Sequence, residues 1–108
     1  MATPPLGRFR SRLSLQLPVD VEDGAGGMSR TWQFVADVWG SIEPLAAQQR
    51  FMAQRMEQSV THVIYLRWRA DICLGWRLLF GSRTFLVHAC YDPTTQKRHL
   101  VCQCEEIV

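Results

Sequence analysis

Long apolar runs and a strong excess of charge are both missing from this chain of 108 residues. No stretch of about 18 consecutive apolar residues occurs, so no membrane-spanning helix is predicted. The opening residues, MATPPLGRFR, lack the apolar run of a secretory signal peptide, and we expect the chain to be made in a cytoplasm. A formal net charge of +2 gives no electrostatic argument for a nucleic-acid or membrane partner.

Cysteine spacings typical of zinc sites are also absent. Structural zinc sites space their cysteines by about two to four residues at a turn, whereas Cys102 and Cys104 are one residue apart in an alternating segment. Their thiols are therefore expected to face the core side by side, and neither they nor His99 are predicted to bind a metal. All four cysteines are expected to be buried, reduced thiols: Cys73, Cys90, Cys102 and Cys104.

No nucleophile with a positioned base can be recognised, so we predict no enzymatic activity. His62 and His88 lie among apolar neighbours, where a histidine is usually part of the core. A glycine-rich loop such as the one over 23–27 holds phosphate when a helix follows it, but here a strand pattern follows. We therefore expect no cofactor.

What the chain does have is alternation of apolar and polar residues with a period of two, which is typical of half-buried strands. After an irregular arm over 1–7, the pattern predicts about six strands, the first ended by Pro18 and the second carrying a bulge or bend at Gly40. Gly81-Ser82 has the form of a two-residue type II′ hairpin turn. The expected strands cover 9–17, 31–42, 61–69, 76–80, 85–89 and 99–106.

This pattern favours an all-β class over the single domain 1–108, as a small antiparallel β-barrel or sandwich. Hydrophobic residues make up 47% and charged residues 20%, which indicates a globular chain. Alternation places these residues in the core: Trp32, Phe34, Ile64, Leu66, Trp68, Leu78, Phe80 and Leu100.

The segment 45–59, between the second and third strands, does not alternate. Pro44 suits the first turn of a helix, and the residues up to Gln58 include no glycine and no β-branched residue. The segment is too long for a hairpin loop, which usually has about 2–5 residues. It is predicted to be a short helical excursion and the main functional element, either packed passively on the barrel or able to move.

These features in this order resemble the head–tail joining, or head closure, proteins of long-tailed bacteriophages. The resemblance covers nearly the whole chain and is most specific in two segments, WGSIEPL over 39–45 and THVIYLRWR over 61–69. Family members typically carry alanine where Gly40 stands, and often a glycine shortly after the Pro-Leu pair. Ala46 and Ala47 replace that glycine here and extend the predicted helix toward its N-terminus.

The resemblance implies a small β-barrel that forms a homo-oligomeric ring at the junction of head and tail in a phage or gene transfer agent particle. Such a ring lies between the portal-bound adaptor and a tail terminator or tail tube protein, closes the DNA channel after packaging and docks the tail. It would also touch channel DNA without reading its sequence. The residues proposed for this gate and its interfaces are Leu45, Gln48, Gln49, Arg50, Phe51, Met52, Gln54, Arg55, Met56 and Gln58.

Two other classes remain open from the residues alone. A tail terminator or tail-completion protein is also a small-barrel virion component. A nucleic-acid-binding barrel needs exposed aromatic residues among basic ones. The only candidate is RWR over 67–69, whose Trp68 alternates with the inward-facing Ile64 and Leu66.

Overall fold

The computed structural model describes residues 9–46, 59–72 and 74–107. All regular structure in these residues is β, which confirms the all-β class and the expected six strands. The irregular segment predicted over 1–7 lies outside the described residues, and so do residues 47–58 of the predicted helical excursion. The strands are β1 (Ser11–Glu22), β2 (Met28–Pro44), β3 (His62–Arg67), β4 (Arg77–Phe80), β5 (Arg83–Tyr91) and β6 (His99–Ile107).

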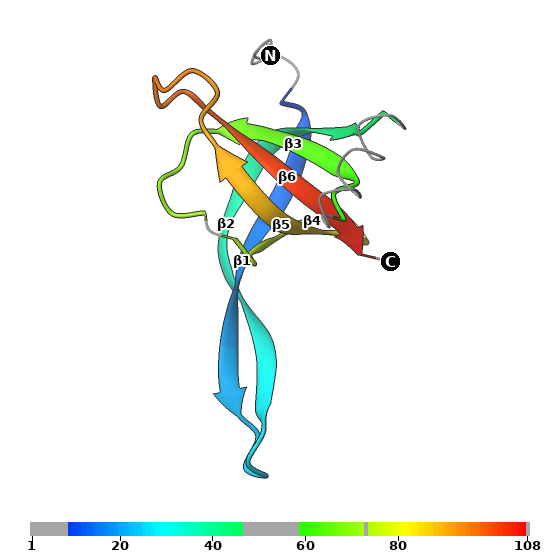
Figure 1. Cartoon of the computed structure of the whole chain (residues 1–108), viewed down its shortest axis with the longest axis vertical. Helices are drawn as coiled ribbons and strands as arrows, with labels where there is room; N and C mark the ends of the chain where they lie inside the picture. Colours follow the sequence, from blue (N-terminus) through cyan, green and yellow to red (C-terminus); the bar gives the residue numbers. More distant parts are fainter. Residues whose placement is uncertain (1–8, 47–58, 73, 108) are drawn as a thin grey trace.

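The six strands form one antiparallel sheet that closes into a barrel in the order β1-β2-β3-β6-β5-β4 (Figure 1). The barrel closes where residues 14–16 of β1 pair with β4. Beyond this point residues 17–22 of β1 pair only with residues 28–33 of β2. This two-stranded ribbon, which we call the arm (residues 17–33), projects from the barrel in Figure 1.

The core is made by alternate side chains of all six strands, which point into the barrel. Four predicted core residues are buried, on the three strands β3, β4 and β6: Ile64, Leu66, Leu78 and Leu100. Leu13, Leu15, Phe85 and Val87 complete these layers with no exposed surface. A smaller cluster of Phe9, Tyr65 and Val101 lies apart from the main core.

Phe34 and Phe80 were predicted in the core and are instead 55% and 37% exposed. On β2 the register shifts, because Leu15 pairs with Ala36 while the next residue of β1 pairs with Phe34. Val35 is therefore an extra residue, and a bulge of this kind reverses the alternation beyond it. Val35 packs against the core in place of Phe34.

The two predicted core tryptophans are only half-buried. Trp32 lies at the base of the arm, and the Arg77 guanidinium carbon lies 4.1 Å from its ring centre. The Nε of Arg77 also donates a hydrogen bond of 2.6 Å to the side-chain oxygen of Gln16. The Trp32 ring is therefore covered on one face by the Arg77 side chain and does not pack in the core. Trp68 packs against the outer part of the core just beyond the end of β3.

Two other expectations need correction. The bulge predicted at Gly40 lies at Val35, and Gly40 keeps regular pairing with both Ser11 and Leu66. Pro18 does not end β1, which continues to Glu22. Proline is tolerated at this position because β1 there has a hydrogen-bonding neighbour on one side only, as at the edge of a sheet.

Gly40 is needed because the barrel is tightly packed around it. A Cβ at this position would lie 2.6 Å from a methyl carbon of Leu66, 2.8 Å from one of Leu13 and 2.8 Å from the Tyr65 carbonyl oxygen. The alanine found here in the family that the sequence resembles therefore requires these neighbours to move.

We expect Gly40→Ala to lower the free energy of unfolding by about 1–3 kcal/mol, as other overpacked core substitutions do. Denaturant titration of the purified chain measures this. Ser41→Ala, one residue further along the same strand, is the control and should change stability by less than about 0.5 kcal/mol. Equal stability of Gly40→Ala and the unmodified chain would contradict this explanation of the glycine.

The hairpin turn predicted at Gly81-Ser82 is present, and the glycine-rich loop over 23–27 forms the tip of a second hairpin. Gly81 has a φ of +60° and Ser82 does not have a positive φ, as a type II′ turn requires. At the tip of the arm, the Asp23 carboxylate accepts hydrogen bonds from the N–H groups of Ala25 at 2.8 Å and Gly27 at 3.1 Å. These two bonds lower the pKa of Asp23, because they stabilise the charged form of its carboxyl group.

Candidate functional site at the two ends of the barrel

Of the residues predicted to act as a gate, the structure describes only Leu45, which is half-buried just after β2. The other nine lie within 47–58, outside the described residues. The structure does show where the segment leaves the barrel and where it returns. The Leu45 N–H donates to the Thr61 carbonyl oxygen at 3.0 Å, and the Thr61 N–H donates to the Cys104 carbonyl oxygen at 2.9 Å. We call Leu45, Thr61 and Cys104 the neck.

Thr61 ties the neck to β6 through its side chain as well. Its hydroxyl oxygen accepts a hydrogen bond of 2.8 Å from the Glu106 N–H and lies 2.9 Å from Nδ1 of His62. The adjoining Val60 is 5% exposed, so the returning chain is packed before β3 begins. The base of the segment is therefore fixed to the barrel.

We expect Thr61→Val to cost about 1–3 kcal/mol of stability, because it keeps the shape of the side chain but leaves the partly buried Glu106 N–H without its acceptor. Thr84→Val is the matched control, since Thr84 is half-buried on β5, and it should change stability by less than about 0.5 kcal/mol. Urea unfolding of both variants measures the difference, and equal losses would show that the Thr61 hydroxyl does not anchor the neck.

A charged cluster lies beside the neck. Nε and a terminal nitrogen of Arg83 donate to the Glu106 carboxylate at 2.8 and 3.1 Å, and Nε2 of His62 lies 3.8 Å from the same carboxylate. The Arg83 guanidinium holds the pKa of Glu106 below its ordinary value. The rings of His62 and Phe85 are in edge contact at 5.2 Å. The cluster joins β3, β5 and β6. Within it, the positive charge of Arg83 is neutralised by the carboxylate of Glu106.

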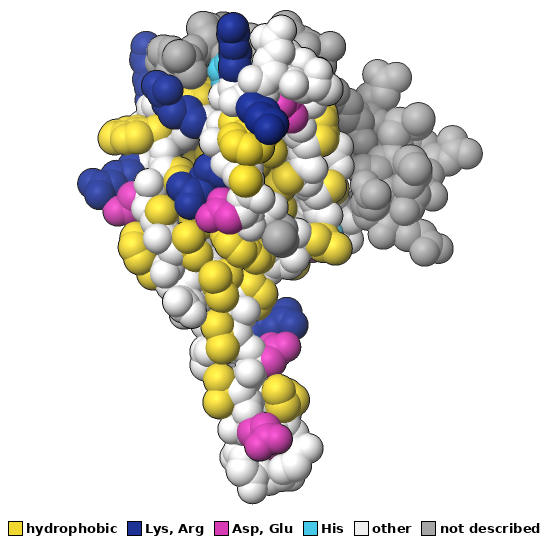
Figure 2. Space-filling model, turned by 90° about the vertical axis from the view of Figure 1, so that its left-hand side faces the viewer, with side chains coloured by type: hydrophobic (Ala, Val, Ile, Leu, Met, Phe, Trp, Pro, Cys, Tyr) yellow, Lys and Arg dark blue, Asp and Glu magenta, His cyan; other side chains and the backbone are white. Residues whose placement is uncertain are grey.

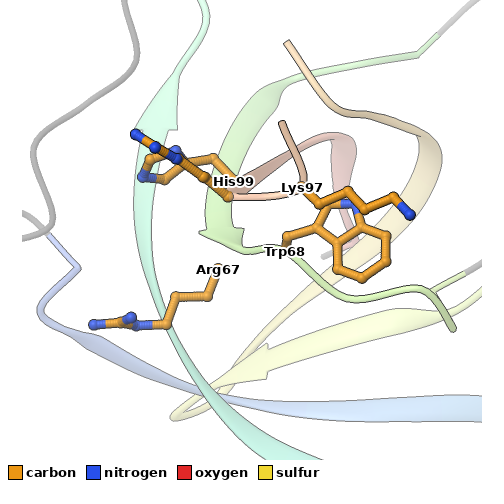
Figure 3. A pocket seen from close by; sticks show the side chains of 5 residues that line it. Arg67, Trp68, Lys97 and His99 are labelled. Atoms are coloured by element: carbon orange, nitrogen blue, oxygen red, sulfur yellow. The ribbon is translucent and has the colours of Figure 1, made fainter. Parts of the chain in front are cut away.

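The opposite end of β3 leads to a second site, which we call the basic pocket. Its lining residues are Arg67, Trp68, Lys97, Arg98 and His99, and its volume is about 490 Å³. Arg67 and His99 pair directly across β3 and β6. In Figure 3 their side chains extend toward one side of the pocket, while Lys97 lies along Trp68. The Lys97 amine is 5.6 Å from the centre of the Trp68 ring.

The loop that carries Lys97 is held by Asp92. Its carboxylate accepts hydrogen bonds from the N–H groups of Thr94 at 3.0 Å and Lys97 at 2.7 Å. Thr95 and Lys97 have φ values of 56° and 57°, a region that side chains other than glycine rarely adopt. The loop therefore holds the Lys97 side chain against the pocket in a conformation that costs free energy.

The basic pocket differs from the rest of the surface in its charge balance. Four arginines elsewhere each pair with a carboxylate within about 3 Å: Arg12 with Asp37, Arg30 with Asp20, Arg69 with Asp71, and Arg83 with Glu106. Over the described ranges, Arg67, Lys97 and Arg98 have no such partner. Lys and Arg side chains gather on the barrel face seen in Figure 2. Nε2 of His99 is buried, again without a hydrogen-bond partner in the described part.

Sequence reasoning missed this pocket. Alternation places Trp68 of the RWR segment in the core, and the last predicted strand begins only at His99, so Lys97 and Arg98 fall outside every predicted element. Only the pairing of β3 with β6 brings the two segments together, and no local signal in the sequence shows that pairing.

In the part of the chain that the structure describes, no three His, Cys, Asp or Glu residues are placed to hold a metal ion. No helix there is long and apolar enough to cross a membrane. Of the four cysteines predicted to be buried, Cys102 and Cys104 are buried, Cys90 is half-buried with its sulfur 3.2 Å from that of Cys102, and Cys73 lies outside the described residues. The hydrogen bond with Cys90 and burial raise the pKa of Cys102, and burial raises that of Cys104.

Comparison with known proteins places the chain among phage proteins. Residues 4–107 match the family described as "Phage head completion protein". A chain from the virion of a native gene transfer agent particle has a similar structure, with a TM-score of 0.63, 26% identity, and coverage of 94% of this chain and 97% of that one. Protein SF1141 from Shigella flexneri 2a has a TM-score of 0.73 at 21% identity, covering 94% and 95% of the two chains, which shows the shared fold. No curated protein sequence matches significantly.

Proposed function

The chain belongs to the phage head completion protein family, and from this we propose that it closes the head of a phage or gene transfer agent particle as a ring between portal and tail. It is a virion protein with a structural role in head closure. In the proposed ring, each copy contacts the portal-bound adaptor on one side and the tail terminator or tail tube protein on the other. The segment 45–59 closes the DNA channel, and the ring docks the tail without catalysing a reaction.

The family match carries this proposal, and the neck supports the assignment of the gate to the segment 45–59. A segment of more than ten residues leaves the barrel at Leu45 and returns at Thr61, two residues joined by a backbone hydrogen bond. Its insertion at one end of a closed barrel leaves the fold complete without it, so the segment is free to serve an assembly.

The composition of the segment supports contact with DNA. It contains Arg50 and Arg55 but only one carboxylate, Glu57. A ring multiplies this surplus positive charge around one axis. Contacts between arginine and phosphate do not depend on base sequence, so such a lining could retain any packaged DNA. Retention should weaken as salt concentration rises.

The proposal is tested with heads assembled in the absence of the chain and then supplied with the purified protein. We expect heads without it to lose packaged DNA to nuclease and to remain without tails, and addition of the chain to restore both properties. Nuclease protection and electron microscopy measure these outcomes. Heads that keep DNA and join tails without the chain would exclude a head-closure role. Closed heads beside tails of uncontrolled length would instead identify a tail terminator.

A further inference from the structure

The arm has a surface that no part of its own barrel covers. Val21 is 47% exposed and Met28 is 63% exposed, and both flank the turn at its tip. Apolar side chains continue along the arm in Figure 2. An exposed apolar surface on a slender projection commonly marks a protein contact.

The tip of the arm is also acidic. Asp20 is neutralised by Arg30 at 3.1 Å, whereas Glu22 has no cationic partner in the described residues. The Asp23 carboxylate accepts only backbone hydrogen bonds and keeps its charge. The tip therefore presents two uncompensated negative charges, at Glu22 and Asp23, next to two exposed apolar side chains.

The basic pocket has the complementary properties. It holds three cations without carboxylate partners in the described residues, beside the apolar face of Trp68. Two arginine forks suit carboxylates in particular, because each can form two parallel hydrogen bonds with one carboxylate. A lysine and a tryptophan next to them suit a segment that combines acidic and apolar side chains.

The surroundings of the pocket favour an acidic protein segment over a DNA duplex. A duplex presents a long row of phosphates and needs an extended row of cations. Next to Arg67 and Trp68, however, a shallow hollow includes Asp37 and Arg69, and both belong to neutral ion pairs with Arg12 and Asp71. The uncompensated positive charge of the pocket therefore does not continue into this neighbouring hollow.

We propose that the tip of the arm, Val21 to Met28, binds in the basic pocket of a second copy of this chain. The arm points away from the barrel, and the loop between β5 and β6 that borders the pocket lies at the far side of the barrel from it (Figure 1). One molecule cannot fill its own pocket, so the contact joins two copies. Because tip and pocket are different surfaces, the contact is head-to-tail, the type that generates rings when its rotation closes. The inference rests on the proposed ring and names the surfaces that link its subunits.

The single lysine of this chain makes the contact easy to test chemically. A carbodiimide joins a carboxylate to an amine without a spacer, and Lys97 is the only side-chain amine among 108 residues. The full-length protein, mixed as ¹⁵N-labelled and unlabelled copies at high concentration and also within assembled particles, is treated and digested. Mass spectrometry should find hybrid cross-links from Lys97 to Glu22 or Asp23. Lys97→Arg should lose the cross-link but keep the association measured by sedimentation.

Charge exchange tests the same contact without cross-linking. Glu22→Arg and Arg67→Glu should each weaken self-association roughly tenfold, because each places like charges together. Both changes in one chain should restore it. Arg83→Glu, with the same charge change beside the neck at the opposite end of the barrel, is the matched control and should leave association unchanged.

Several results would overturn the inference. Cross-links from Lys97 to other carboxylates, or none at all, would exclude the tip as occupant. Failure of the double charge exchange to recover association would exclude a direct pairing. A salt-dependent affinity for duplex DNA that Arg67→Glu abolishes would assign the pocket to DNA. If particles contain the chain but give no such cross-link, the inference fails and the proposed function stands. If the chain does not enter particles, the proposed function fails.

Discussion

Leu66→Ala is expected to lower the free energy of unfolding by about 2–5 kcal/mol. Leu66 has no exposed surface and lies on β3, where it pairs with Gly40 on one side and Leu100 on the other. Truncation removes buried methyl groups and leaves a cavity that the barrel cannot readily collapse, because β3 is paired with β2 and with β6 at this position. Chemical denaturation followed by tryptophan fluorescence measures the loss.

Phe34→Ala is the informative control for this substitution. Alternation in the sequence places Phe34 in the core, whereas the structure leaves it 55% exposed beyond the Val35 bulge. Its truncation should therefore cost less than about 0.5 kcal/mol, despite the larger side chain. A loss for Phe34→Ala similar to that for Leu66→Ala would mean that the register of β2 is wrong.

Replacing residues 46–59 by a tight glycine turn should produce heads that lose their DNA before tails attach. The barrel should still fold, because Leu45 and Thr61 are already joined by a backbone hydrogen bond and Val60 keeps its buried place. Circular dichroism and sedimentation verify folding and ring formation, and nuclease sensitivity of packaged heads measures DNA retention.

A second variant separates the charge of the segment from its length. Arg50→Gln combined with Arg55→Gln keeps every residue position but removes the surplus positive charge. Retention of DNA by this variant should be partial and should fail at lower salt than in the unmodified particle.

One outcome for the chain shortened by the glycine turn would contradict the gate. If that chain yields heads that keep their DNA and accept tails normally, the segment is not the gate.

The sequence was sufficient for those parts of the fold that depend on neighbours in the chain. Period-two alternation located the inward faces of β3 and β6, where Ile64, Leu66 and Leu100 are buried. The glycine at 81 identified a turn because a positive φ in that position is cheap only for glycine.

The features that were missed depend on which strands lie side by side. The bulge at Val35 becomes visible only when β2 is aligned with β1, and Pro18 is acceptable only because β4 does not reach it. Likewise, Arg67 and His99 form one site only because β3 pairs with β6. Strand order and the closure of the barrel are long-range properties, and no local pattern specifies them.

The arm also divides the molecule into parts of unequal stability. Residues 17–22 and 28–33 bond only to each other, and Val21 and Met28 on them bury little surface. A ribbon of this kind opens without disturbing the barrel, so its amide hydrogens should exchange with solvent far faster than those of β3 and β6. Because the arm's own hydrogen bonds protect it only weakly, a neighbour that engages the tip should slow amide exchange there, and the exchange rates of the arm would report on that contact.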